Sequence, residues 1–157
     1  MEVGRAIEED AAAVTALWTA AYTDDPRGGR EAPYAVEDFH SSAEAGEILI
    51  VRDEGALAGV VAIYMAGARD GMIATAGEAE LSRLAVAEQH RRRGIGRSLV
   101  VNCLQLAAER SATALVLWSQ PHQVEAHRLY SSLGFRRAPD RDAEDPNGHR
   151  LVFSRPL

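Results

Sequence analysis

Apolar and polar residues follow two spacings along this chain, and each spacing predicts a different kind of element. Short, mostly apolar runs bounded by turn residues are typical of strands. They predict strands at 3–7, 47–52, 57–66, 80–86, 114–118, 135–138 and 151–155. Apolar residues that recur every three or four positions are typical of helices with one buried face. They predict helices at 10–22, 36–45, 94–111 and 124–133.

Capping and turn residues mark the ends of several of these elements. Asp10 belongs to the residue types that cap helices, so we expect it to cap the first helix. Gly134 follows the last helix, at a position where glycine commonly ends helices. The residues at 53–55 form a turn between two strands and so predict a hairpin.

The order of these elements predicts a single domain over residues 1–157, of the α/β class, or α+β in some schemes. A mixed central sheet of six to seven strands is flanked by about four helices, which cover both of its faces. The chain has 157 residues, which is enough for one domain with a proper core. No linker, repeat or low-complexity tract divides it.

The stretch from Glu80 to Leu99 combines a strand, an arginine-rich turn and a helix that begins at two glycines. The free N–H groups at a helix N-terminus, together with the helix dipole, make a binding site for anions. Glycine lets a bulky ligand approach the backbone closely. We therefore expect phosphate to bind here, through backbone N–H groups and nearby side chains of Arg91, Arg92, Arg93, Gly94, Ile95, Gly96, Arg97 and Ser98.

Three alternative kinds of site fit this stretch less well. A dinucleotide fold needs a third glycine where the chain has Leu99, and a nucleotide-triphosphate loop needs a Lys-Ser/Thr pair that is missing. The arginine run alone would indicate a solvated basic face or a patch for nucleic acid. A net charge of −6 and the lack of aromatic residues within the run disfavour nucleic acid as a partner.

Two motifs in this order resemble those of the GCN5-related N-acetyltransferase (GNAT) superfamily. Arg91-x-x-Gly94-x-Gly96, preceded by Leu84-Ala85-Val86, is similar to its acetyl-CoA signature. Gln123-x-x-Ala126-x-x-Leu129-Tyr130-x-x-x-Gly134-Phe135 is similar to a second motif, in which Asn is usual at the position of Gln123. The resemblance implies the fold of acyl-CoA N-acyltransferases, with acetyl-CoA as co-substrate and no metal.

The resemblance also implies how the co-substrate is bound. The backbone around Arg92 to Arg97 holds its pyrophosphate. The strand Leu84-Ala85-Val86 lies beside the pantetheine and offers a backbone N–H to the thioester oxygen. That role requires the strand to separate from its neighbour. Gln123, in place of Asn, is expected to alter a contact to the pantetheine arm.

Direct transfer of acetyl to a primary amine of a small molecule or peptide needs a base and an acid. Glu80 stands where a glutamate is the general base in one branch of the superfamily, although a glutamate at a strand end is often only solvated. Tyr130 stands where relatives use tyrosine to protonate the leaving thiolate, although its spacing also suits a core aromatic residue. The alternative function is a non-catalytic acyl-CoA-binding or regulatory domain with the same fold.

The remaining composition bounds the setting of the protein. Cys103 is the only cysteine, and its place in an apolar pattern predicts core packing. His122 and His127 lack the spacing of a metal site. No signal peptide and no apolar run long enough for a membrane is expected, so a cytoplasmic protein without membrane contact is the default. Dimers are common in the superfamily, which leaves a homodimer open.

The acceptor amine cannot be identified from the sequence, because the segments expected to bind it carry both charges. These segments are roughly 22–34 and 139–149. Their acidic side chains would attract a cationic amine, and their basic ones would bind a carboxylate. The charged residues concerned are Asp24, Asp25, Arg27, Arg30, Arg137, Asp140, Arg141, Asp142, Glu144 and Asp145.

Overall fold

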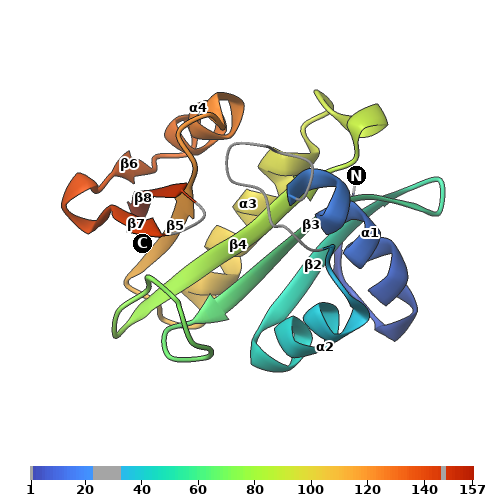
Figure 1. Cartoon of the computed structure of the whole chain (residues 1–157), viewed down its shortest axis with the longest axis horizontal. Coiled ribbons are helices and arrows are strands. Elements are labelled where there is room, and N and C mark those ends of the chain that lie inside the picture. The colour runs from blue at the N-terminus through green and yellow to red at the C-terminus, as the bar shows by residue number, and fades with distance from the viewer. Residues whose placement is uncertain (1, 23–32, 146–147) are drawn as a thin grey trace.

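The computed structural model describes residues 2–22, 33–145 and 148–157, which form one twisted sheet with helices on both faces (Figure 1). The helices are α1 (Ala11–Tyr22), α2 (Val36–Ala45), α3 (Ile95–Glu109) and α4 (Val124–Ser132). The strands are β1 (Val3–Arg5), β2 (Glu47–Asp53), β3 (Ala56–Met65), β4 (Glu78–Val86), β5 (Ala114–Ser119), β6 (Arg136–Arg137), β7 (Ala143–Asp145) and β8 (Gly148–Pro156). Short 3-10 turns are η1 (Glu8–Asp10), η2 (Glu88–His90) and η3 (Pro139–Arg141).

The strands follow the order β1-β2-β3-β4-β5-β8-β6, and β7 pairs with β8. The β4–β5 pair is parallel, and the other pairs are antiparallel. The sheet is therefore mixed, as predicted, and β7 adds a strand to the expected six to seven. The α/β class is confirmed. Within the described residues, none of the helices is both long and apolar enough to cross a membrane.

Alternation along the strands divides the apolar side chains between two cores. Ile48 and Ile50 of β2 pack on one face with α1 and α2, around the fully buried Trp18. Leu49 and Val51 of the same strand pack on the other face, against α3. This face also buries Cys103, as the sequence predicts. A strand with both faces covered explains why the strand runs are almost continuously apolar.

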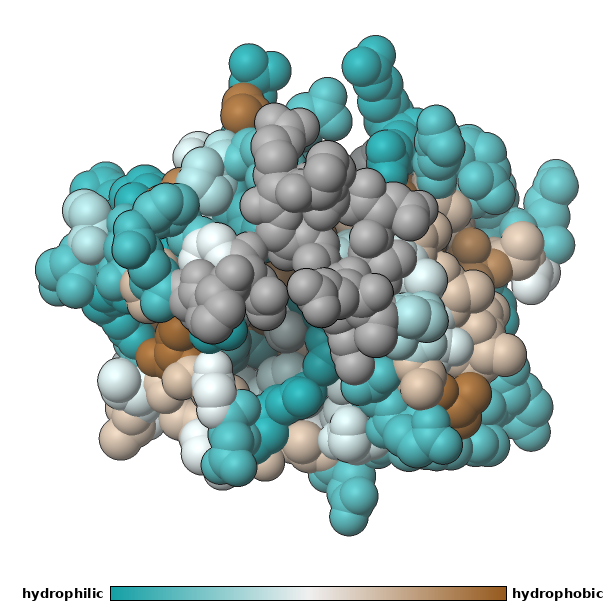
Figure 2. Space-filling model, viewed as in Figure 1, coloured by the Kyte–Doolittle hydropathy of each residue, from teal (hydrophilic) through white to brown (hydrophobic). Residues whose placement is uncertain are grey.

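The surface shown in Figure 2 is mostly hydrophilic, and its apolar residues are scattered. Apolar side chains that are exposed singly are normal on protein surfaces and do not by themselves mark a binding site. The described part of this face therefore gives no indication of a broad apolar interface. Over all described residues, the large apolar side chains that remain exposed are Ile7, Val36, Trp118, Val124 and Leu157.

The central strands β4 and β5 pair only at their first residues. Glu78 to Glu80 of β4 lie opposite Ala114 to Val116 of β5, and no pairing continues beyond them. Both strands go on, β4 to Val86 and β5 to Ser119. The two strands therefore separate toward their carboxyl ends and leave one edge of β4 without a strand partner.

A bulge in β4 lies beside this separation. The register between β3 and β4 shifts between Val60 and Ala62, and Arg83 has a positive φ of 52°. Helix α1 contacts the carbonyl groups of the bulge. Trp18 donates its indole N–H to the Arg83 carbonyl at 3.0 Å, and the Tyr22 hydroxyl donates to the Leu84 carbonyl. The end of α1 therefore supports the irregular part of β4.

Two local predictions differ from the structure. Asp10 ends η1 and precedes α1, and its carboxylate accepts the Ile7 N–H at 2.7 Å, so it caps the 3-10 turn in place of the helix. The segment after the predicted strand at 135–138 contains η3 and β7, which the sequence pattern missed. Helix α2 has the predicted bounds, and Gly134 has the positive φ of 90° expected after a helix.

Gly59 sets how closely α3 lies on the sheet. A Cβ at this position would lie 2.6 Å from Ile95 Cγ2 and 3.0 Å from Leu99 Cδ1. We expect Gly59→Ala to lower the free energy of unfolding by about 1–3 kcal/mol, because overpacking forces buried side chains to move. Urea unfolding measures the change. Gly4→Ala is the matched control, since a Cβ there has no atom within 4 Å, and equal stability of the two variants would contradict this packing.

Candidate active site

A cavity of about 480 Å³ lies where β4 and β5 separate. Glu80 and Leu84 of β4 line it, together with the last residues of β5 and Tyr130 of α4. The loop between β3 and β4 contributes residues from Arg69 to Met72. The cavity thus brings together the predicted base and the predicted acid, which lie 50 positions apart in the sequence.

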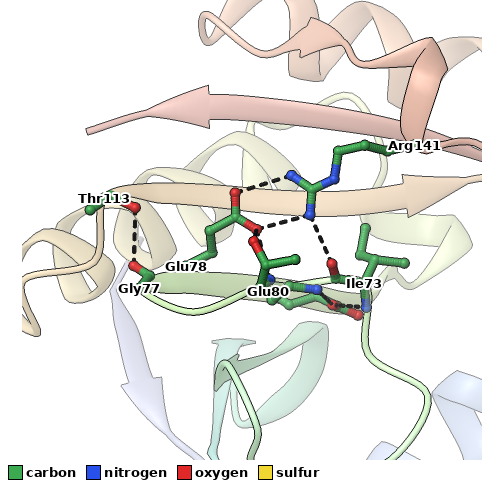
Figure 3. Close-up of polar contacts among 8 residues, drawn as sticks. Ile73, Gly77, Glu78, Glu80, Thr113 and Arg141 are labelled. Atoms are coloured by element: carbon green, nitrogen blue, oxygen red, sulfur yellow. Dashed lines mark hydrogen bonds and ion pairs between the residues drawn. The ribbon is translucent and has the colours of Figure 1, made fainter.

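Glu80 is buried at the wall of this cavity, with 4% of its surface exposed. One carboxylate oxygen, Oε1, accepts the backbone N–H groups of Ile73 at 2.7 Å and Ala74 at 2.9 Å (Figure 3). Burial raises the pKa of Glu80, and these two hydrogen bonds offset only part of that rise. The carboxylate therefore binds a proton more readily than a solvated glutamate, as a general base requires.

Glu78, two residues earlier, binds a different partner through its carboxylate. Arg141 of η3 forms an ion pair with it at 2.9 Å and also donates to the Ile73 carbonyl at 2.8 Å (Figure 3). Burial acts to raise the pKa of Glu78, but hydrogen bonds from Arg141 and Thr75 outweigh it and lower the pKa. The pair joins η3 to the start of β4 and to the loop that Glu80 also holds.

Tyr130 belongs both to the core and to the cavity wall. Its ring packs in the core, 5.7 Å from the ring of Phe135 and 5.9 Å from that of Phe153. The same side chain lines the cavity opposite β4. Burial raises the pKa of Tyr130, so the hydroxyl keeps its proton at neutral pH. Tyr130 thus presents a protonated hydroxyl from a side chain that is almost fully buried.

The N-terminus of α3 has the geometry expected of an anion site. Gly94 precedes the helix with a φ of 80°, in the left-handed region that favours glycine. The first intrahelical bond is from Ser98 N–H to the Gly94 carbonyl at 3.0 Å. The N–H groups of Ile95, Gly96 and Arg97 therefore have no carbonyl of the preceding turn to bond. They are the backbone donors that the sequence predicted for phosphate.

The open edge of β4 offers further backbone groups. Ala87 donates its N–H to the Ala58 carbonyl of β3 at 2.8 Å. Because successive residues of a strand direct their backbone groups to opposite sides, the N–H of Val86 points to the open edge. The separation of β4 from its neighbour, which the predicted contact to the thioester requires, is thus present.

Comparison with known proteins shows a family match over most of the chain. The sequence pattern of the Acetyltransferase (GNAT) family matches residues 11–135, which include Glu80, the start of α3 and Tyr130. The chain belongs to this family. The GNAT resemblance found in the two motifs is therefore confirmed.

Curated relatives from the rat, Rattus norvegicus, match shorter stretches. N-acetyltransferase family 8 member 3 is 31% identical over 88 residues, or 56% of this chain and 37% of the relative. N-acetyltransferase 8B is 40% identical over 58 residues, or 37% of this chain and 26% of the relative. The matched part of this chain thus spans well under half the length of either GNAT relative.

Solved GNAT structures share the whole fold at low sequence identity. Ribosomal-protein-alanine N-acetyltransferase from Brucella melitensis is similar over 100% of both chains, with a TM-score of 0.82 and 21% identity. The yncA acetyltransferase from Salmonella typhimurium, solved with its cofactor acetyl-CoA, covers 100% of this chain and 94% of its own, at a TM-score of 0.81 and 17% identity. A phosphinothricin acetyltransferase from Sinorhizobium meliloti, in complex with acetyl-CoA, has a TM-score of 0.79 and 16% identity. The similarity covers 99% of this chain and 88% of that chain.

The arginine side chains of the GNAT signature mostly contact the protein. Arg93 pairs with Asp53 at 2.8 Å, and Arg97 donates to the Ser132 hydroxyl at 3.2 Å. Arg91 donates to the Val86 carbonyl at 3.4 Å, and Arg92 is exposed with a φ of 63°. Backbone N–H groups are therefore stronger candidates for phosphate than these side chains.

Further predicted binding residues divide between the cavity and the cores. Leu84 lines the cavity, whereas the Ala85 side chain is buried on the α1 face. Ile95 is buried on the α3 face, so only its backbone faces the helix end. Gly96 lies close to α4, because a Cβ there would be 3.4 Å from Leu129 Cδ2.

Gln123 lines the cavity, but its side-chain oxygen accepts hydrogen bonds from groups at the end of β5. It accepts the Ser119 hydroxyl and the Gln120 N–H, both at 2.8 Å. His127 joins this group through Ser119 Oγ at 3.1 Å. The Gln123 side chain thus forms hydrogen bonds within the turn between β5 and α4. An altered contact to a pantetheine arm at this GNAT position stays a prediction.

Among the described residues, most of the charged side chains predicted to bind the acceptor form ion pairs within the protein. Arg137 pairs with Asp142 at 2.6 Å, and His149 lies 2.9 Å from Glu144. The predicted residues at 24, 25, 27 and 30 lie outside the described residues. Among the residues that the structure describes, no group of three or more His, Cys, Asp or Glu side chains is placed to hold a metal ion.

Residues outside the two motifs form another part of the cavity wall, and among them Tyr22, Tyr34 and His149 belong to the segments expected to bind the acceptor. Arg69 comes from the β3–β4 loop, Arg83 from the β4 bulge, and Tyr22 from the end of α1. The loop is small and polar in sequence and gave no signal. A positive φ at an arginine is likewise invisible in the sequence.

Proposed function

We propose that this chain is an acetyl-CoA-dependent N-acetyltransferase, which transfers acetyl directly to a primary amine of a small molecule or peptide. The observation that carries the proposal is the cavity between the separated strands. Glu80 and Tyr130 both line it, and β4 leads through η2 to the N-terminus of α3. The family match and the acetyl-CoA bound in two similar structures support the choice of donor.

The residues present fit this donor. The N–H groups of Ile95, Gly96 and Arg97 would hold the pyrophosphate, and the positive φ of Gly94 turns the backbone toward it. The open edge of β4 would hydrogen-bond the pantetheine arm, with the Val86 N–H as a candidate donor. Acetyl-CoA supplies an activated thioester, so no covalent intermediate on the protein is needed.

Glu80 then acts as the general base, because an ammonium group cannot attack until it loses a proton. Its Oε1 atom is held by the two backbone N–H groups of the β3–β4 loop. The carboxylate accepts the amine proton directly or through one water. The loop thereby fixes the base in position at the cavity wall.

Tyr130 acts as the general acid for the departing thiolate. Its hydroxyl keeps a proton because burial raises its pKa. Packing against Phe135 and Phe153 fixes the ring, so the proton is presented from one direction.

Release of free thiol from acetyl-CoA tests the proposal. The purified chain is incubated with amino acids, polyamines, aminoglycosides, arylamines and short peptides, and acetyl-CoA binding is measured by calorimetry. We expect binding, and release of CoA with one class of amine well above hydrolysis. Binding without release for any amine would favour a non-catalytic acyl-CoA-binding domain, and absence of binding would contradict both functions.

A further inference from the structure

Arg83 places a cation in the cavity wall, and no carboxylate among the described residues pairs with it. Its side chain is half-buried, and its guanidinium lies 4.5 Å from the centre of the Trp18 ring and 5.4 Å from that of Tyr34. The Nη1 atom is buried and has no hydrogen-bond partner among the residues that the structure describes. The two rings hold the guanidinium in place but accept none of its N–H bonds.

Two arginines elsewhere in the molecule show the contrast. Arg141 and Arg137 each use two nitrogens to bind both oxygens of one carboxylate. No carboxylate lies within ion-pair distance of Arg83 in the described part of the chain. A partly buried cation without a partner is unfavourable. A ligand that brings a carboxylate into the cavity would give this cation an ion-pair partner.

Two further arginines line the cavity. Arg69 lines it from the β3–β4 loop and donates to the Tyr64 hydroxyl at 2.9 Å. Arg150 lines it from β8, with its guanidinium 4.5 Å from the centre of the Trp118 ring. Among the described lining residues, the acidic side chains are Asp70, which is exposed, and Glu80. Three arginines against two acids make the cavity locally basic in a chain of net charge −6.

Building on the proposed function, we infer that the acceptor is an amino acid, whose amine is acetylated while its carboxylate binds Arg83. The amine reaches Glu80, and the carboxylate stays with the guanidinium on the same strand. A volume of about 480 Å³ suits a small molecule. A polyamine would bring further positive charge to three arginines, which disfavours it.

Matched acceptors test this inference. Phenylalanine is compared with phenethylamine, methionine with its decarboxylated amine, and lysine with cadaverine, at equal pH and ionic strength. We expect the wild type to favour the preferred amino acid over its decarboxylated partner by about tenfold or more in kcat/KM, since ionic hydrogen bonds to arginine are strong. Arg83→Gln reduces this ratio through a higher KM for the amino acid, and Arg83→Lys restores part of it. Urea unfolding of both variants checks their folding.

The outcomes separate the inference from the proposed function. Equal or better acetylation of the decarboxylated amines by the wild type would overturn the inference and leave the proposed function standing. If no acceptor is acetylated, the proposed function fails for this panel, and calorimetry with the same pairs decides the inference. Binding of amino acids but not of their decarboxylated partners supports it, and absence of any such difference overturns it.

Discussion

We expect Tyr130→Phe to lower kcat by about 100-fold or more while the affinity for acetyl-CoA stays nearly unchanged, because it removes a general acid and little else. Phenylalanine keeps the ring that packs against Phe135 and Phe153. Only the hydroxyl in the cavity is lost. Steady-state rates give kcat, and calorimetry gives the dissociation constant of acetyl-CoA.

Two results would contradict this role for Tyr130. Equal turnover of the variant and the wild type would remove the residue from the mechanism. Loss of acetyl-CoA affinity in proportion to the loss of rate would assign it to binding. The urea midpoint is the control, and we expect it to change little, because the buried ring and its neighbours are retained.

We expect Glu80→Gln to lower kcat/KM for the acceptor by about 100-fold near neutral pH, in the range of general base catalysis. Glutamine has nearly the same shape, and its carbonyl oxygen still accepts the N–H groups of Ile73 and Ala74. The loop is therefore held while the proton acceptor is lost. The loss of kcat/KM in the variant becomes smaller as pH rises toward the pKa of the free amine, because the neutral amine needs no base.

The pH dependence follows from the direction of the pKa shift. Burial raises the pKa of Glu80, so the base is still protonated at pH values where a solvated glutamate has ionised. The wild-type rate should rise with pH through this raised pKa. A pH–rate profile measures it, with Glu78→Gln as the matched carboxylate control. A Glu80→Gln profile that overlays the wild type would exclude Glu80 as the base.

The same shift has a consequence for stability. The folded-state pKa of Glu80 lies above its unfolded value, so its stabilising contribution is complete at low pH and is lost as pH rises through the folded pKa. Above that pH the ionised, buried carboxylate opposes folding. Glu80→Gln should therefore be at least as stable as the wild type at neutral pH, which urea unfolding can measure.

The parts of the fold that depend on local pattern could be predicted from the sequence. Helix α2 and the positive φ of Gly134 follow from periodicity and from the preference of glycine for helix ends. The short hairpin of β7 with β8 was missed, because its residues are polar and show no apolar alternation. An element without a buried face leaves little trace in the hydrophobic pattern.

The candidate site was only partly predictable, for a physical reason. The GNAT resemblance selected Glu80 and Tyr130, and both line one cavity. The loss of pairing beyond Glu80 and Val116 has no sequence signal, since apolar residues continue to recur in both strands past that point. The partners of Glu80 are backbone N–H groups, which every loop residue carries. Long-range ion pairs are equally absent from a local motif. Arg93, which the motif predicted to bind phosphate, instead pairs with Asp53.

The most direct test of the account is a crystal structure of this chain with coenzyme A bound. The account predicts the pyrophosphate at the N–H groups of Ile95, Gly96 and Arg97, and the pantetheine arm along the open edge of β4. The thiol should then lie in the cavity that Glu80 and Tyr130 line. Coenzyme A bound at another surface, or with its thiol outside this cavity, would contradict the central claim.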